Sequence, residues 1–253
     1  MEAYADFSKV YDILMDNVPY KEWAERIIKE LKSSGIDDGL VLELGCGTGT
    51  FCELMAEAGY DMTGVDNSPG MLEAANEKKL KSGHDILYLL QDMREFELYG
   101  TMRAIICICD SLNYLTDKED VFTCFKLVNN YLDPGGMFIF DFNTVHKYRD
   151  VIGDAVIAEN REECSFIWEN EFDEEECIND CLLTIFNRRD DGAYERSEEE
   201  HVQRGYELSE IKELITRAGL EFVKAWNGEE DEEGEATRIF VIAKECQKTE
   251  EIS

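Results

Sequence analysis

Short apolar runs and segments of helical periodicity alternate along the first 150 residues of the chain. The apolar runs predict five strands, at 40–44, 61–66, 85–92, 102–110 and 137–142. The intervening segments carry apolar residues three or four positions apart, which predicts helices, and one more amphipathic helix precedes them at 19–34. Strands that alternate with helices of this length predict a parallel, doubly wound α/β sheet.

Residues at the helix ends support these boundaries. Ser68 followed by Pro69 is typical of a helix start, because the hydroxyl can cap free N–H groups and proline suits the first turn. The spacing of Thr116 and Glu119 predicts a capping box at the start of another helix. Gly59 fits the end of the helix that contains Phe51.

The pattern changes after the fifth strand. Residues 155–206 lack helical periodicity; 164–172 alternates polar and apolar positions, 181–186 is a second strand, and Asp191-Gly192 is a hairpin signal before a third. We expect an antiparallel β insertion that serves as a lid or as an oligomer contact. A helix at 209–218 and strands at 220–227 and 237–244 follow, and then a short tail.

Charge narrows the range of partners. The chain of 253 residues has 25 Lys and Arg against 57 Asp and Glu, a net charge of −32, which repels phosphate backbones and makes nucleic acid an improbable partner. No basic leader or apolar run of membrane-spanning length is present, so we expect a cytoplasmic protein without a membrane contact. The nine cysteines fit reduced, buried thiols, and their spacing predicts no metal site.

Three glycines follow the first predicted strand, in "VLELGCGTGTF" (41–51). This spacing suggests that a ligand approaches the backbone closely where a strand meets a helix. A dinucleotide fingerprint would need a further glycine at Thr50. Asp66 ends the second strand, 21 residues after Gly45, where a carboxylate can bind the ribose of an adenosine. That acid suits a dinucleotide as well as any other adenosyl ligand.

Later stretches decide between these ligands. They are "VLELGCGTG" (41–49), "GVDNSPGML" (64–72), "LLQDMREF" (89–96), "CICDSLNYL" (107–115) and "LDPGGMFIFDF" (132–142). With them the chain resembles the class I S-adenosylmethionine-dependent methyltransferases, in particular small bacterial methyltransferase-domain proteins that act on small molecules. The resemblance covers about residues 1–150 and 207–245. It implies a Rossmann-like, seven-stranded, mostly parallel sheet and S-adenosylmethionine as the cofactor.

By position, the resemblance also implies a set of cofactor-binding residues. They are Tyr11, Tyr20, Gly45, Gly47, Gly49, Asp66, Asn67, Met71, Asp92, Met93, Asp110 and Ser111. The glycines would pass along the methionyl part of the cofactor. Asp66 would accept hydrogen bonds from the ribose hydroxyls, with Asn67 and Met71 bordering the adenosine.

The other acids follow from the same resemblance. Asp92 would accept from the adenine amino group beside the backbone of Met93, Asp110 and Ser111 would line the sulfonium side, and Glu43 would orient the loop. Carboxylates suit the positive sulfonium, whereas a pyrophosphate favours positive helix ends. Each acid also has a purely structural interpretation as a cap at the end of a strand.

The acceptor side has no such motif. A general base is needed only if the acceptor loses a proton, and the candidates are His146, His201 and Tyr11. Three groups of side chains could border an acceptor or serve only in packing: Tyr4, Phe7, Tyr11, Tyr20 and Trp23; Asn143, His146, Tyr148 and Arg149; and Trp168, Glu169, His201, Arg204 and Tyr206.

We therefore expect a methyltransferase that acts on N or O of a small molecule. The alternatives are an NAD-dependent oxidoreductase of similar architecture, a non-catalytic cofactor-binding module, and an RNA methyltransferase, which the charge disfavours. The expected parts are a cofactor domain at 1–150 and 207–245 with a helical lid at 1–35, the insertion at 151–206 with a homodimer contact as one use, and a tail at 246–253.

Overall fold

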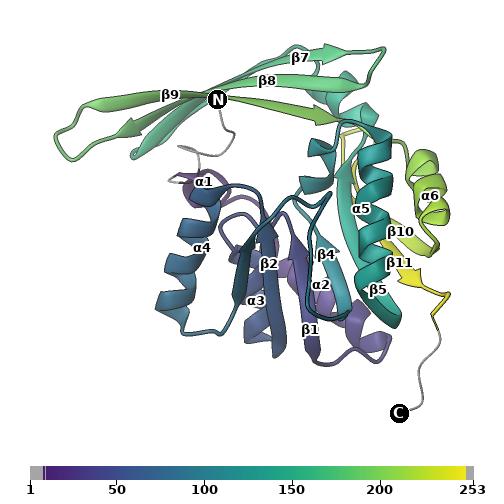
Figure 1. Cartoon of the computed structure of the whole chain (residues 1–253). Helices are drawn as coiled ribbons and strands as arrows, with labels where there is room; N and C mark the ends of the chain where they lie inside the picture. Colours follow the sequence, from purple (N-terminus) through teal and green to yellow (C-terminus); the bar gives the residue numbers. More distant parts are fainter. Residues whose placement is uncertain (1–7, 9, 249–253) are drawn as a thin grey trace.

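Two separate β-sheets organise the structure, a computed structural model that describes residue 8 and residues 10–248 (Figure 1). Tyr4, Phe7 and residues 249–253 of the expected tail lie outside the described residues. The described start of that tail is held in place, since the Lys248 ammonium donates to the carbonyls of Asn129, Asn130 and Leu132.

The larger sheet has seven strands in the order β10-β11-β5-β4-β1-β2-β3. Neighbouring strands from β1 to β5 pair in parallel, whereas β11 runs antiparallel to both β5 and β10. This arrangement confirms the Rossmann-like, mostly parallel sheet. The strands are β1 (Gly39–Leu44), β2 (Tyr60–Asp66), β3 (Leu87–Leu90), β4 (Met102–Cys107), β5 (Leu132–Asn143), β10 (Leu220–Glu230) and β11 (Ala236–Glu245).

Two strands are shorter than the sequence predicts. The edge strand β3 keeps only four residues, and Leu87 and Leu90 are exposed on it. Strand β4 ends at Cys107 because Cys109 and Asp110 adopt left-handed backbone conformations, with φ of +61° and +52°. That turn begins the 3₁₀ helix η2 (Ser111–Tyr114) at the carboxyl end of the sheet.

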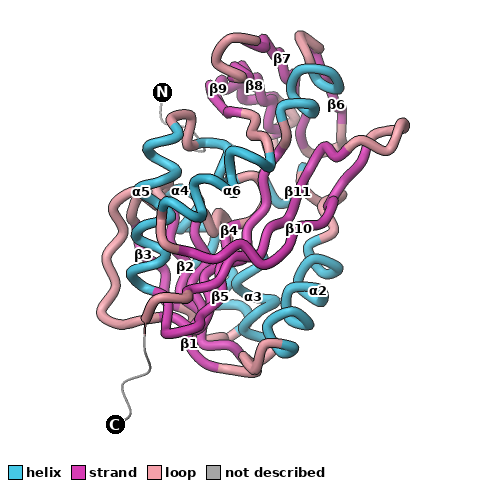
Figure 2. The backbone as a smooth tube through the Cα atoms, turned by 90° about the vertical axis from the view of Figure 1, so that its right-hand side faces the viewer, coloured by secondary structure: helices cyan, strands magenta, loops and turns pink. Residues whose placement is uncertain are grey.

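Helices cover both faces of the large sheet. Apolar residues of α2 (Tyr20–Ser33), α3 (Thr50–Glu57) and α4 (Pro69–Ser82) pack on one face, and those of α5 (Lys118–Tyr131) and α6 (Leu208–Arg217) on the other. Figure 2 shows α2 and α3 across the strands from α6. None of the helices in the described part of the chain combines the length and apolar character that a membrane crossing needs.

One helix start confirms its predicted cap and another does not. The Ser68 hydroxyl accepts from the N–H of Met71 at the start of α4. Helix α5 begins one residue later than predicted, and its cap is Asp117, whose carboxylate accepts from the N–H of Glu119 at 2.8 Å. The predicted capping box of Thr116 is therefore wrong, because the neighbouring carboxylate takes the capping position.

The second sheet consists of four antiparallel strands in the order β6-β7-β8-β9 and follows β5 in the sequence. A π-helical segment, η3 (Lys147–Ile152), leads into it, and the strands are β6 (Val156–Asn160), β7 (Cys164–Asp173), β8 (Ile178–Arg188) and β9 (Tyr194–Arg204). The antiparallel insertion is thus confirmed. The sequence pattern misses β6, because all five of its residues are exposed and give no alternation.

The N-terminal segment joins the two sheets. Val10 and Leu14, at either end of the short helix α1 (Tyr11–Leu14), form an apolar cluster with four buried side chains of the insertion. These are Cys164, Cys181, Leu183 and Ile185. Figure 1 shows the four-stranded sheet above α1 and above one end of the large sheet. The insertion therefore covers the side of the domain where α1 lies.

The packing between α5 and the large sheet gives a stability test. Phe125 is fully buried, and its ring centroid lies 5.3 Å from that of Phe138 and 5.1 Å from that of Phe140. We expect Phe125→Ala to lower the free energy of unfolding by about 3–5 kcal/mol, measured by urea denaturation. Leu80→Ala, at an exposed position of α4, is the control and should cost no more than about 0.5 kcal/mol. Equal losses in both variants would contradict the assigned core.

Candidate functional site

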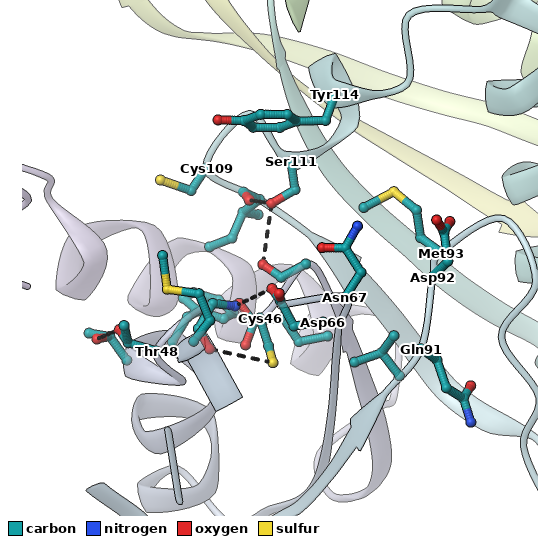
Figure 3. Close-up of a pocket in the computed structure, with 18 of the residues that line it drawn as sticks. Cys46, Thr48, Asp66, Asn67, Gln91, Asp92, Met93, Cys109, Ser111 and Tyr114 are labelled. Carbon is teal, nitrogen blue, oxygen red and sulfur yellow. Dashed lines mark hydrogen bonds between the residues drawn. The ribbon is translucent and has the colours of Figure 1, made fainter. Parts of the chain in front are cut away.

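A pocket opens at the carboxyl ends of β1, β2, β3 and β4, and residues of α1 and α2 close one side of it. Figure 3 shows Tyr114, Cys109 and Ser111 on one side of the pocket and Asp66 on the other. Ten of the predicted cofactor-binding residues line it: Tyr11, Tyr20, Gly45, Gly47, Asp66, Asn67, Met71, Asp92, Met93 and Ser111. The topology explains this convergence, since parallel strands end at a common edge.

The glycine loop can exist only without side chains at two of its positions. Gly45 has φ of +66°, and a Cβ atom there would lie 2.5 Å from the Ser111 hydroxyl oxygen. Gly49 has φ of +75°, and its Cβ would lie 2.3 Å from the phenol oxygen of Tyr88. Gly49 is not among the described pocket-lining residues; it lets the loop pack on β3 and start α3, and its place along the cofactor stays a prediction.

Asp66 connects the ends of β1 and β2. One carboxylate oxygen accepts from the N–H of Gly47 and the other from the N–H of Ser68, both at 2.8 Å. Burial raises the pKa of Asp66, and these backbone N–H groups oppose the shift by stabilising the charged form. Each oxygen keeps a further lone pair, so the carboxylate can accept two hydroxyl groups of a ligand.

Asp92 lies to one side of Asp66, next to Met93 (Figure 3). Its two oxygens accept three hydrogen bonds from Arg94, which also donates to Asp120. The Arg94 guanidinium holds the pKa of Asp92 below its usual range. Arg94 is the one cationic side chain among the described residues that line the pocket, and both of its partners are carboxylates.

Two tyrosines form a wall of the pocket from the N-terminal segment. The phenol oxygens of Tyr11 and Tyr20 lie 3.4 Å apart, and that of Tyr20 lies 3.4 Å from the Cys109 sulfur. Burial raises the pKa of the Cys109 thiol to about 12, so the sulfur is neutral. This wall joins α1, α2 and the turn after β4.

A carboxylate of the same segment holds α1 on the glycine loop. Asp12 accepts from the hydroxyl of Thr48 at 2.7 Å and from the ammonium of Lys78 at 2.8 Å, and more distantly from the hydroxyl of Thr50. The start of a helix attracts anions, and here the Asp12 carboxylate already lies beside the first residue of α3, whose hydroxyl donates to it. The arrangement is unfavourable for the pyrophosphate of a dinucleotide.

Asp110 does not lie where the sequence suggests. Its carboxylate points to Arg238 of β11, at 2.7 Å, and to Gln203 of β9, at 2.8 Å, and it is not among the described residues that line the pocket. Buried Asp141 fixes the turn by accepting from the N–H groups of Cys109 and Asp110. The expected position of Asp110 at the sulfonium is therefore corrected, because the buried arginine attracts its charge.

Ser111 takes the position beside the loop. Its hydroxyl donates to the carbonyl of Gly45 at 3.2 Å and to that of Ile108 at 2.9 Å. The next residues were not singled out from the sequence: Asn113 is fully buried, and its amide bonds the backbones of Asn143 and Arg204. These bonds fix η2, so that Tyr114 at its end lines the pocket.

The three candidate bases lie in different places. Tyr11 lines the pocket. His146 does not line the pocket. Its ring lies between the carboxylates of Asp231 and Asp150, which raise the pKa of the imidazole. The structure therefore places His146 in a surface cluster of charges and not at the expected site. His201 of β9 is buried, and its Nδ1 lies 3.1 Å from the phenol oxygen of Tyr114. His201 is therefore separated from the pocket by one side chain, that of Tyr114.

Most of the other acceptor candidates serve in packing. Tyr148 and Tyr206 are fully buried, and the Tyr206 hydroxyl donates to the carbonyl of Leu115. Asn143 donates to the Tyr148 hydroxyl, and the Arg204 guanidinium lies over the ring of Tyr206. Three others make none of these contacts: Glu169 and Arg149 are exposed, and Trp168 packs on the cluster around Cys181.

Below the glycine loop lies a carboxyl group away from water. Glu43 is 3% exposed, and the Cys52 thiol donates to it at 2.8 Å. Burial raises the pKa of Glu43 to about 8. Glu43 therefore carries little charge at neutral pH and supports the loop as a neutral hydrogen-bonding group.

This raised pKa predicts how stability depends on pH. Between about pH 4.5 and 8 the unfolded chain releases a proton that folded Glu43 keeps, so its contribution to stability falls as the pH rises. We expect the free energy of unfolding of Glu43→Gln, relative to that of the wild type, to increase by up to about 1.4 kcal/mol per pH unit as the pH rises through this range. Glu57→Gln, at an exposed position of α3, is the control. Parallel pH curves for Glu43→Gln and the wild type would contradict the raised pKa.

Comparison with known proteins gives a consistent result. A family model described as "Methyltransferase domain" matches residues 41–136. A curated relative, the putative methyltransferase YqeM of Bacillus subtilis (strain 168), is 35% identical over 246 residues and covers 95% of this chain and 96% of its own. The match thus extends over nearly the whole chain, with the glycine loop and the insertion included.

Solved structures agree. A crystal structure of an S-adenosylmethionine-dependent methyltransferase from Clostridium acetobutylicum ATCC 824 has a TM-score of 0.86 and 29% identity, over 97% of this chain and all of that one. S-adenosylmethionine-bound CalS10, an amino pentose methyltransferase from Micromonospora echinaspora, has a TM-score of 0.75 and 17% identity, over 97% and 98% of the two chains. The second likeness shows the fold alone.

Proposed function

Because the chain belongs to the class I S-adenosylmethionine-dependent methyltransferases, we propose that it transfers a methyl group to nitrogen or oxygen of a small molecule. The same membership decides against the NAD-dependent oxidoreductase and the non-catalytic module. S-adenosylmethionine supplies a methyl group on a positively charged sulfur. The protein itself therefore binds the cofactor and the acceptor, orients them and excludes water.

The residues of the pocket fit this cofactor. We propose that Asp66 accepts from the two ribose hydroxyls through its remaining lone pairs, and that the backbone of Gly45 and Gly47 runs beside the methionyl part. Asn67 and Met71 would border the adenosine. The assignment is supported by the close approach of the loop to Ser111, which leaves no room for a side chain at Gly45.

The adenine side needs one more partner. We propose that Asp92 accepts from the exocyclic amino group beside the Met93 backbone, with Arg94 keeping the carboxylate charged. Cys109, Ser111 and the two wall tyrosines lie at the other end of the pocket and would enclose the sulfonium.

A roof over the pocket, formed by α1 and the insertion, is the observation that supports a small acceptor. Helix α1 is bound below to the glycine loop through Asp12 and packs above on the insertion through Val10 and Leu14. A roof built from two sides suits an acceptor small enough to be enclosed more than a polymer that passes through, and an amino pentose methyltransferase is among the solved structures of the same fold. The net charge of −32 also disfavours RNA.

Three further parts of the proposal rest on single observations. All nine cysteines are free thiols, which supports a reducing compartment such as the cytoplasm. The exposed edge strand β6 supports a homodimer contact through the insertion. The separate hydrogen-bonded sheet supports treating residues 151–206 as an inserted subdomain of the cofactor domain, with residues 1–35 as its lid.

A labelling experiment tests the function. The protein is incubated with S-adenosylmethionine that carries a labelled methyl group and with the low-molecular-weight fraction of a bacterial extract. We expect label to appear in a small molecule on nitrogen or oxygen, which mass spectrometry and NMR identify. Label found only in RNA or protein from the same extract would contradict the proposal.

The assignment of Asp66 gives a quantitative test. Asp66→Asn keeps one oxygen acceptor but removes the charge, and a hydrogen bond to a charged group contributes about 1.5–3 kcal/mol. We expect calorimetry to show about 10–100-fold weaker binding of S-adenosylhomocysteine. Asp61→Asn, at an exposed position of the same strand, is the control and should bind as the wild type does. Wild-type affinity in Asp66→Asn would contradict the assignment.

A further inference from the structure

The strand β9 buries polar side chains where a β-sheet normally buries apolar ones. Glu199, His201 and Gln203 alternate along one face of the strand and are only 2%, 6% and 6% exposed. Gln203 is explained by its hydrogen bond to Asp110. Burying the other two, both ionisable, is costly, and such groups gather at functional sites.

His201 connects this buried face to the pocket. Its Nδ1 lies 3.1 Å from the phenol oxygen of Tyr114, and its Nε2 lies 3.5 Å from a carboxylate oxygen of Glu199. The Tyr114 and His201 rings meet edge to face, with centroids 6.1 Å apart. A carboxylate beside Nε2 favours the proton on that nitrogen, so that Nδ1 faces the phenol with a lone pair that can accept its proton.

Tyr114 is the member of this row that reaches the pocket. It lines the pocket together with Cys109 and Ser111, on the side opposite Asp66 (Figure 3). Its backbone is fixed by the neighbouring Asn113, whose amide bonds the ends of both β5 and β9. The phenol oxygen is therefore held between the pocket and the inside of the insertion.

We propose that Tyr114, His201 and Glu199 form a proton relay that takes a proton from the methyl acceptor into the insertion. The relay rests on the proposed methyl transfer and deepens it: Tyr114 is the catalytic residue, and His201 and Glu199 are positioning residues that act through it. Such a relay serves an acceptor whose reacting group carries an N–H or O–H, such as an amine or a hydroxyl.

The proton and electron balance is complete without another reactant. The acceptor atom forms a bond to the methyl carbon, the carbon–sulfur bond breaks, and its electron pair stays on the sulfur. The acceptor proton passes to the Tyr114 oxygen while the Tyr114 proton passes to Nδ1 of His201. The imidazolium that forms faces the Glu199 carboxylate, and after product release the proton returns to water.

The first test needs no turnover. The chain contains three histidines, so ¹⁵N NMR of histidine-labelled protein can separate His201 from His84 and His146. We expect His201 in the form protonated on Nε2, with an Nδ1 signal that shifts in Tyr114→Phe while the other two histidines stay unchanged. A proton on Nδ1 in the neutral wild type would overturn the relay.

The second test measures transfer of labelled methyl to the low-molecular-weight extract fraction across pH. We expect Tyr114→Phe and His201→Gln to lower the rate about 100-fold, the usual scale of acid–base catalysis, and His201→Gln to lose the rise of the wild-type rate with pH. Among the described residues, the titratable groups next to His201 include Tyr114 of η2, Glu199 of its own strand and Cys181 of β8. His146→Gln, outside the pocket, is the control.

Binding of S-adenosylhomocysteine distinguishes a failure of the relay from a failure of the proposed methyl transfer. S-adenosylhomocysteine should bind the wild type and both relay variants with the same affinity within about threefold, which also shows that the variants fold. Label transfer at wild-type rates and with the wild-type pH dependence in both variants would overturn the relay and leave the methyltransferase proposal standing. No label in any small molecule with the wild type would overturn the proposed function and the relay together.

Discussion

The carboxylate of Asp66 is the interaction on which the site depends. It accepts from the backbone of Gly47 after β1 and of Ser68 after β2, and so fixes two strand ends relative to each other. The glycine loop can take its left-handed turns only because Gly45 and Gly49 lie against Ser111 and Tyr88 without side chains. These contacts fix an edge of the sheet at which a partly buried carboxylate faces the pocket.

The second constraint is that one short helix packs against both the glycine loop and the insertion. Helix α1 offers Asp12 to the glycine loop and Lys78, Tyr11 to the pocket, and Val10 and Leu14 to the insertion. Because these contacts come from residues next to one another, α1 cannot leave the pocket without also leaving the inserted sheet. The glycine loop and the insertion are thus physically coupled through α1.

The residues proposed for the cofactor were predictable as a group at one edge because their signals are local. Gly45 follows β1, Asp66 ends β2 and Asp92 lies two residues after β3, and parallel strands end at one edge. The side of the pocket proposed for the acceptor was not predictable, because distant residues set its geometry. Asp110 turns to Arg238, 128 positions away, and His201 reaches Tyr114 only through the return of β9.

Two strands also escaped full prediction, because exposed residues leave no burial pattern in the sequence. Strand β6 has no alternation to detect, since all five of its residues are exposed, and β3 keeps only four residues at one edge of the large sheet, with Leu87 and Leu90 exposed. Sequence periodicity records which residues are buried, so it fails where a strand is exposed on both faces. The order of elements and the antiparallel character of the insertion, which depend on burial, were read correctly.

A crystal structure with bound S-adenosylhomocysteine tests the central claim most directly. The account predicts the ribose hydroxyls on the Asp66 carboxylate and the sulfur turned toward the side of the pocket formed by Cys109, Ser111 and Tyr114. A nucleoside bound without contact to Asp66, or with its sulfur turned away from Tyr114, would contradict the account.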